Sequence, residues 1–205
     1  MRVVTLANHK RIVMEQIMNL LNGDFVNQLT SGISKQTGAS EAETQSVVST
    51  AIPALLGALQ NNANSTQGSE GILSALASKH DGSILNNLSG FLGSSDTADG
   101  NGILKHVLGD KRGALEQAIS GKTGVSSGTV SQILAMLAPI VMGYLGKQSR
   151  SKNVSDGNGL NDLLGGLLGG QSGSNILGGL LDQNGDGKLG IDDVGGLLGG
   201  FFGKK

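Results

Sequence analysis

Residues 126–145 read SSGTVSQILAMLAPIVMGYL, and the spacing of their apolar side chains predicts a long buried helix. Ser126 follows a turn at Thr123-Gly124, where its hydroxyl can accept hydrogen bonds from the free amides of the first helical turn. Pro139 lies inside the pattern and should kink the helix, because proline removes a backbone hydrogen bond. The apolar residues share one broad face: Ile133, Leu134, Leu137, Ala138, Val141, Met142 and Leu145.

The same pattern occurs 86 residues earlier in the chain. The stretch ISKQTGAS at 33–40 returns as ISGKTGVS at 119–126, and the same offset relates Pro53 to Pro139. Ser40 and Glu43 have the spacing of a reciprocal capping box at the start of the earlier helix. We interpret the two regions as copies of one supersecondary unit. The paired prolines would either shape a groove or bend the helices around a small core.

Shorter helical patterns lie around these two copies. Segments 70–78 and 83–92 lie between them, and GILKHVLG at 102–109 precedes the later copy. A DGNG turn begins at Asp99 and again at Asp156, and each turn leads directly into a helical pattern. A helix cap is therefore a better interpretation of both turns than a cation site.

Residues 182–193 carry the one motif with defined chemistry, DQNGDGKLGIDD. This segment matches the 12-residue EF-hand loop, in which a flexible chain supplies the six to eight oxygen ligands that Ca²⁺ requires. Gly187 stands at position 6 and permits the sharp bend of such a loop. The predicted ligands are the side-chain oxygens of Asp182, Asn184, Asp186 and Asp193 and the backbone carbonyl of Lys188.

The loop departs from the EF-hand pattern in two respects. Asp193 stands where the pattern has Glu, so its carboxylate reaches less far, and the loop is solitary although such loops normally occur in pairs. We expect a dissociation constant on the order of 10⁻⁵ to 10⁻³ M for Ca²⁺, with Mg²⁺ as a real competitor. The alternative interpretation is a polar turn between two helices that holds no metal.

The predicted organisation is all-α. We expect an N-terminal extension at 1–17, which a mis-assigned start codon would explain, a duplicated helical domain at 18–150, and a Gly/Leu-rich tail at 151–205. Each glycine costs about 1 kcal/mol against alanine in an exposed helix, so the tail helices should form only when docked. We expect calcium to order the tail. The alternative, a tail that inserts into a membrane, is disfavoured because each apolar run is too short to span one.

Composition excludes several classes of function. The net charge is −1 and shows no basic stripe, which disfavours nucleic-acid binding, and the absence of cysteine excludes disulfides and thiolate chemistry. No apolar run approaches 18 residues, and no secretory signal is evident, so we expect no transmembrane segment. The cytoplasm is the default location, although weak calcium affinity would suit the periplasm or the cell exterior better.

No enzyme signature is found. His9, His80 and His106 are widely spaced, and no nucleotide-binding, hydrolase or metalloprotease motif occurs. His80 and Asp81 could imitate a base and its orienting carboxylate, but residues adjacent in a helix rarely face each other in that way. For His106 we expect a partly buried or helix-capping role. A deep polar pocket containing either His80 or His106 would revive an enzymatic interpretation.

The GILKHVLG run, the TGVS turn at 123–126 and LAMLAPIVMG at 134–143 together resemble the YidB-like family of bacterial proteins, domain of unknown function number 937. The resemblance covers about 18–150 and implies a small, mainly helical protein without an established activity. We expect a non-enzymatic, calcium-binding structural or protein-interaction protein with an unknown partner. The alternative is a self-associating or envelope-associated scaffold in which the metal is only a structural staple.

Overall fold

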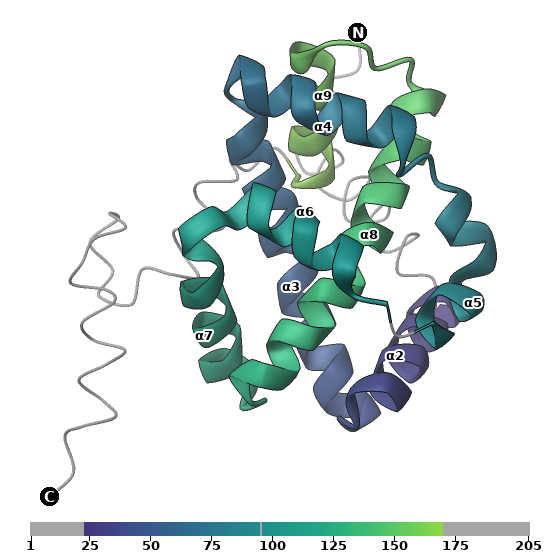
Figure 1. Ribbon diagram of the computed structural model, residues 1–205, viewed down its shortest axis with the longest axis vertical. Coiled ribbons are helices and arrows are strands. Elements are labelled where there is room, and N and C mark those ends of the chain that lie inside the picture. The colour runs from purple at the N-terminus through teal and green to yellow at the C-terminus, as the bar shows by residue number, and fades with distance from the viewer. Residues whose placement is uncertain (1–22, 95, 170–205) are drawn as a thin grey trace, which may run out of the picture.

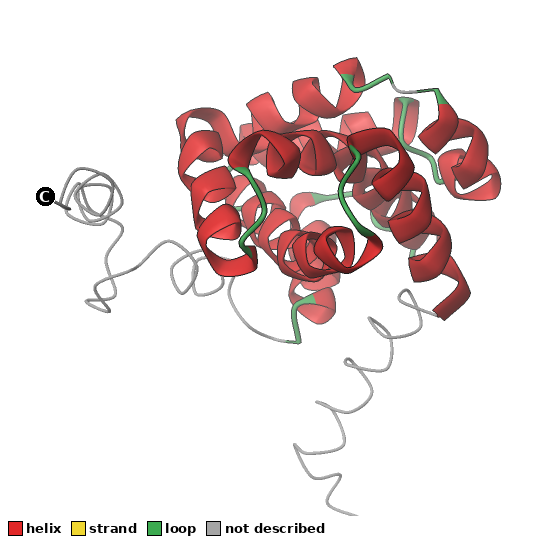
Figure 2. Ribbon diagram, turned by 90° about the horizontal axis from the view of Figure 1, so that it is seen from below, coloured by secondary structure: helices red, strands yellow, loops and turns green. Residues whose placement is uncertain are grey.

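A computed structural model describes residues 23–94 and 96–169, and every regular element in these two ranges is a helix (Figure 1, Figure 2). The all-α prediction is therefore confirmed for the described residues. In chain order the α-helices are α2 (Gly23–Thr37), α3 (Glu41–Ala63), α4 (Thr66–Ser78), α5 (Leu88–Gly93), α6 (Ala98–Leu108), α7 (Arg112–Thr123), α8 (Ser127–Ser151) and α9 (Gly157–Leu167), and two 3₁₀ turns are η1 (Ser83–Asn87) and η2 (Gly109–Lys111).

The two long helices begin as the sequence predicts. The Ser40 hydroxyl accepts a hydrogen bond from the Glu43 amide at 3.2 Å, and a Glu43 carboxylate oxygen accepts one from the Ser40 amide at 2.8 Å. At the start of α8 the Ser126 hydroxyl accepts a bond from the Thr129 amide at 3.2 Å. Both expected N-caps are thus confirmed, and they satisfy amides that have no partner within the helix. Pro53 and Pro139 lie inside α3 and α8, respectively.

Helix α8 forms the centre of the core. Its residues from Ile133 to Gly143 are all buried, so this part of the helix is covered on every side. Among the described helices, α8 alone has the length and composition of a membrane span, and 72% of its most apolar window is buried by the rest of the protein. Burial on this scale is the pattern of a core helix. Figure 1 shows α6 lying across α8, with α4 and α9 together at one end of the molecule and α2 with α5 near the other.

Contact with α8 requires glycine on both sides of the interface. A methyl group on Gly100 of α6 would overlap the carbonyl of Ala135, and one on Gly146 of α8 would overlap the carbonyl of His80. These two glycines let the backbones of α6 and of the segment after α4 approach α8 directly. Their positions therefore fix where α6 and the 80–84 segment lie.

The two DGNG turns have different roles. Asp156 caps α9, because its carboxylate accepts a hydrogen bond from the Gly159 amide at 2.8 Å. The expected cap at Asp99 is wrong, since α6 begins at Ala98 and Asp99 already lies in its first turn. The preceding acid explains the difference: the Asp96 carboxylate accepts a hydrogen bond from the Ala98 amide at 2.9 Å, which leaves Asp99 free to face another element.

Substitution of glycines in the described helices tests this packing. We expect Gly100→Ala to lower the free energy of unfolding by about 2–3 kcal/mol, because the new methyl group must push α6 away from α8. The matched control is Gly113→Ala in α7, where an added methyl group meets open space and which does not line the groove described below. This control should raise stability by about 0.5–1 kcal/mol through helix propensity alone. Urea unfolding followed by circular dichroism measures both, and equal midpoints for the two variants would contradict the proposed contact.

Candidate interaction groove

The predicted calcium site lies outside the described residues. The structure therefore does not place Asp182, Asn184, Asp186, Lys188 or Asp193, nor the predicted tail helices beyond residue 169. Within 23–94 and 96–169, no cluster of three or more His, Cys, Asp or Glu residues is arranged to hold a metal ion. A candidate site in the described part of the chain must therefore be sought in its cavities.

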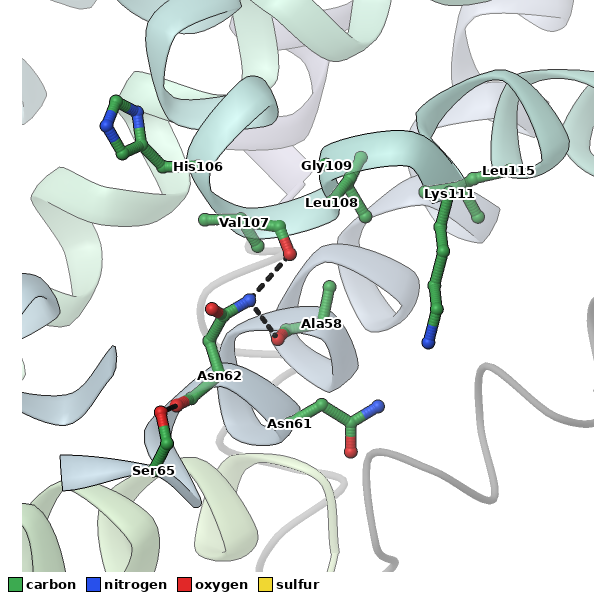
Figure 3. A pocket seen from close by; sticks show the side chains of 10 residues that line it. All are labelled: Ala58, Asn61, Asn62, Ser65, His106, Val107, Leu108, Gly109, Lys111 and Leu115. Atoms are coloured by element: carbon green, nitrogen blue, oxygen red, sulfur yellow. Dashed lines mark hydrogen bonds between the residues drawn. The ribbon is translucent and has the colours of Figure 1, made fainter. Parts of the chain in front are cut away.

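A groove runs between α4 and α6. It encloses about 800 Å³, and an adjoining hollow of about 360 Å³ continues it between the end of α3 and the start of α7 (Figure 3). The two spaces share Asn62, Ser65, His106 and Val107, so they form one continuous feature. A volume of this size is typical of a ligand or peptide site. We call this feature the α4–α6 groove.

The walls of the α4–α6 groove combine apolar side chains with polar ones, among them Gln67, Lys79 and Asp99. Helix α4 contributes Ile72 and Ala75, α6 contributes Ile103 and Val107, and Met142 of α8 lies at the bottom. Each wall also exposes bare backbone, because a methyl group added at Gly71 of α4 or Gly102 of α6 would meet no atom within 4 Å. Both walls can therefore accept the close approach of another segment.

The polar groups where the two spaces meet are already paired. The Asn62 side-chain amide donates to the carbonyl of Val107 at 2.6 Å and to that of Ala58 at 3.4 Å (Figure 3). The Ser65 hydroxyl donates to the carbonyl of Asn62 at 3.1 Å and accepts from the Gly68 amide at 3.1 Å, which caps α4. These bonds hold α3 against α6 and define the shape of the groove, but they engage the polar groups that a ligand would otherwise use.

His80 is the buried titratable residue of the groove. Its side chain is 7% exposed, and its Nε2 lies 3.7 Å from a carboxylate oxygen of Asp99. Burial lowers the pKa of His80 below its ordinary value of 6.5; the Asp99 carboxylate opposes this effect and the Lys79 ammonium adds to it. His80 is therefore held in the neutral form at pH 7. The gap to Asp99 is wider than a hydrogen bond, so this contact does not fix the tautomer of the neutral imidazole.

Asp81 is not the partner of His80. Its carboxylate accepts a hydrogen bond from the Ser83 amide at 2.9 Å and lies 3.4 Å from the Arg150 guanidinium, and the bonds to Ser83 hold its pKa at about 2. The residue that faces His80 comes instead from the first turn of α6. Sequence reasoning missed Asp99 because eighteen residues separate it from His80, and no local pattern signals the pair.

His106 is exposed, and the expectation that it would be partly buried is wrong. Its Nδ1 lies 2.8 Å from the carbonyl oxygen of Gly102, one turn earlier in the same helix. The side chain therefore folds back on α6 at the edge of the groove. This position follows from the amphipathic pattern of α6, in which Leu104 and Leu108 face the core.

The groove contains both His80 and His106. A deep polar pocket containing either histidine was the feature that would revive an enzymatic interpretation. The Ser65 hydroxyl is used in the cap of α4, and no hydrogen bond within the described part of the chain joins a nucleophile to either histidine. Covalent catalysis requires a nucleophile within reach of a base.

Comparison with known proteins identifies one family. A family model described as bacterial protein of unknown function (DUF937) matches residues 19–148, which is more than half of the chain and includes the groove. No curated protein matches the chain, and no solved structure matches it. The resemblance to domain of unknown function number 937 is therefore confirmed.

The buried histidine predicts a pH dependence of stability. A depressed pKa means that the unfolded chain binds a proton at His80 more readily than the folded chain does. We therefore expect stability to be highest above pH 6.5 and to fall as the pH drops through 6.5 toward the lower folded pKa. Urea midpoints measured between pH 7.5 and about 5 would show this decline.

Two variants separate His80 from other groups. His80→Gln should flatten the decline, whereas the matched control His106→Gln, an exposed residue of the same groove, should retain it. Asp81 does not contribute in this window, because its carboxylate titrates between about 2 and its ordinary value of 3.8. Identical pH profiles for the wild type and His80→Gln would refute the assignment.

Proposed function

The chain belongs to the DUF937 family of bacterial proteins of unknown function, and from that premise we propose that it is a non-enzymatic, calcium-binding protein-interaction protein. In this proposal the helical body presents the α4–α6 groove to a partner segment, and the loop at 182–193 binds the ion. The proposal also includes a closer relationship of this chain to the YidB-like proteins within that family. The observation that carries the proposal is the groove itself.

The groove has the features of a helix-binding site. Its walls are two helices, α4 and α6, which both pack on α8 and α3. Apolar side chains line it, and glycine leaves backbone exposed in the middle of each wall. Amphipathic helices bind such grooves through apolar anchors on one face, while packing of the scaffold keeps the walls apart. A partner segment with a row of aliphatic side chains fits this lining.

Calcium binding is supported by the ligand set in the sequence. Asp182, Asn184 and Asp186 stand at positions 1, 3 and 5 of the motif, from which an EF-hand loop takes side-chain oxygen ligands. Lys188 contributes only its backbone carbonyl, so its charge does not oppose the ion. Asp193 closes the loop with a short carboxylate, which favours weak binding and gives Mg²⁺ access to the same site.

We also propose that the body arose from two copies of a helical hairpin. The turn of α2–α3 and that of α7–α8 share local details: the Thr37 hydroxyl donates to the Ile33 carbonyl at 2.9 Å, and the Thr123 hydroxyl donates to the Ile119 carbonyl at 2.7 Å. Gly38 and Gly124 follow with φ values of 73° and 75°. The same bonds at an offset of 86 residues support descent from one unit.

The second candidate is a scaffold that associates with itself or with the cell envelope. The observation that favours it is the Gly/Leu-rich tail, whose leucine pairs require a surface on which to pack. Sedimentation of the full chain with and without Ca²⁺ separates the two functions. A monomer in both conditions supports the interaction protein, and oligomers that persist without the ion support the scaffold.

Calorimetry tests the calcium loop. Titration of metal-free protein with Ca²⁺ should give one binding event with a dissociation constant on the order of 10⁻⁵ to 10⁻³ M. Asp186→Ala should abolish the heat, because it removes the ligand at position 5 of the loop. The matched control is Asp192→Asn. Asp192 stands at position 11, next to Asp193, and supplies no ligand in this type of loop, so this variant should bind Ca²⁺ nearly as well as the wild type.

The result that would overturn the calcium proposal is specific. If millimolar Ca²⁺ and Mg²⁺ produced no heat with the wild-type chain, the loop would be a polar turn. If Asp186→Ala and Asp192→Asn lost the same amount of affinity, the effect would be one of net charge and not of coordination.

A further inference from the structure

Helix α9 shows how a Leu-Leu-Gly-Gly-Leu-Leu sequence packs in this protein. In LLGGLL at 163–168, Leu163, Leu164, Leu167 and Leu168 are all buried. The helix packs on α3, α4 and α8, and the Asn161 side-chain amide donates to the carbonyl of Ala63 at 3.2 Å. The paired glycines lie between the two leucine pairs. This sequence is therefore a docking motif whose bound form is visible in α9.

The same motif occurs twice more along the chain. Residues 176–181 read ILGGLL, with aliphatic pairs and glycines in the same order as at 163–168. Residues 197–202 read LLGGFF, with phenylalanine in place of the second leucine pair. The copies at 176–181 and 197–202 lie on either side of the predicted calcium loop. Each copy therefore carries the apolar pattern that α9 uses for docking.

We propose that the segment 176–181 docks in the α4–α6 groove of its own chain, on the side of α4 that α9 does not cover. The inference deepens the proposed function and rests on its assignment of the groove as a binding site, because it names the segment that fills it. A partner segment must then displace the tail. The protein is consequently an interaction protein whose binding groove is covered by its own C-terminal region.

The side chains that line the groove fit the segment 176–181. Ile72, Ala75, Ile103 and Val107 offer aliphatic contacts to the leucine pairs. Gly71 and Gly102 leave the two walls open to the backbone of a helix that has glycines of its own. Close approach of helices through small residues is favourable because it brings many atoms into contact.

The packing of the described helices does not explain why glycine occurs at 71 and 102 in the walls of the groove. Among the described helices, several glycines would tolerate an added methyl group, but most of these lie in the first or last turn of their helix. Gly71 and Gly102 lie in the middle of α4 and α6, where glycine costs about 1 kcal/mol against alanine. No packing contact of the described body offsets that cost. A segment docked against both walls accounts for it.

The chain can reach the groove from the end of α9. A methyl group on Gly165, near that end, would lie 3.3 Å from the Gln60 side chain on α3, and the next residue, Asn61, lines the groove. Six residues, 170–175, separate the described chain from the segment 176–181. Extended chain spans about 3.3–3.6 Å per residue, so this connection covers roughly 20 Å. In the proposed docking this connection passes from the end of α9 around α3, where Gln60 and Asn61 are adjacent.

Cysteine cross-linking tests the proposal in the full-length chain. The protein has no cysteine, so two introduced residues form the only possible disulfide. We expect Ala75→Cys combined with Gly179→Cys to form an intramolecular disulfide under mild oxidation, as does Ala98→Cys combined with Gly179→Cys, and both pairs leave Gly71 and Gly102 unchanged. A disulfide requires Cα atoms about 4.4–6.8 Å apart, so its formation reports close approach. Peptide mass spectrometry after proteolysis identifies the bond.

The matched control pairs Gly179→Cys with Ser49→Cys. Ser49 is exposed and lies on α3, 13 residues before the groove residue Asn62. That separation corresponds to roughly 20 Å along a helix. We expect the groove pairs to oxidise at least 10-fold faster than this control pair. Equal rates would mean that the tail meets all surfaces at random, and would overturn the proposal.

Two further measurements give distinct outcomes. Mixing chains that carry only Ala75→Cys with chains that carry only Gly179→Cys detects exchange of the tail between molecules. Disulfides formed only in this mixture would overturn docking within one chain. Calorimetry with Ca²⁺ is run on the same variants. Rapid groove disulfides without any heat would leave tail docking in place and refute calcium binding, whereas heat with slow groove disulfides would refute docking alone.

Discussion

Helix α8 is covered by other helices along its middle third, and the close approach of their backbones to it determines the rest of the structure. Gly100 brings α6 onto the carbonyl of Ala135, and Gly146 admits the carbonyl of His80. These contacts have no flexible side chain between them, so neither neighbour can shift without separating from the core. The directions of α6 and of the 80–84 segment are consequently fixed by α8.

The groove is a consequence of that constraint. Helices α4 and α6 both pack on α8, and the Asn62 amide ties the end of α6 to α3. Arg112 adds a further tie, because its guanidinium bonds to Glu116, Asn101 and Ser131 and thereby joins α7 to α6 and α8. A cavity with walls held in this way keeps its shape without a ligand. Binding then costs little reorganisation of the scaffold, which favours affinity for a preformed helix or for a segment that folds as it docks.

Sequence reasoning was most successful where the determinants are local. The caps at Ser40 and Ser126 and the long apolar helices after them depend on residues within a few positions of one another, so pattern and spacing were sufficient. The pairing of His80 with Asp99 depends on the placement of α6 against α8, which no local pattern encodes. The same holds for the groove: glycine at 71 and at 102 was visible in the sequence, but only the fold shows that both face one space. The metal ligands at 182–193 stay a prediction, since they lie outside the described residues.

The energetics of α9 explain how a glycine-rich segment can pack on one particular apolar surface. Two glycines in a helix cost about 2 kcal/mol against alanine, so a free LLGGLL segment gains little from forming a helix by itself. Burial of one leucine side chain contributes about 1.5–3 kcal/mol, and Leu163, Leu164 and Leu167 are all buried in α9. Docking therefore outweighs the glycine cost, whereas the helix alone does not. A segment with this composition orders only where a complementary apolar surface exists, and its conformation reports whether that surface is occupied. In the proposed docking, the tail and the groove are parts of one equilibrium, and any partner of the groove must compete with a sequence that is tethered beside it.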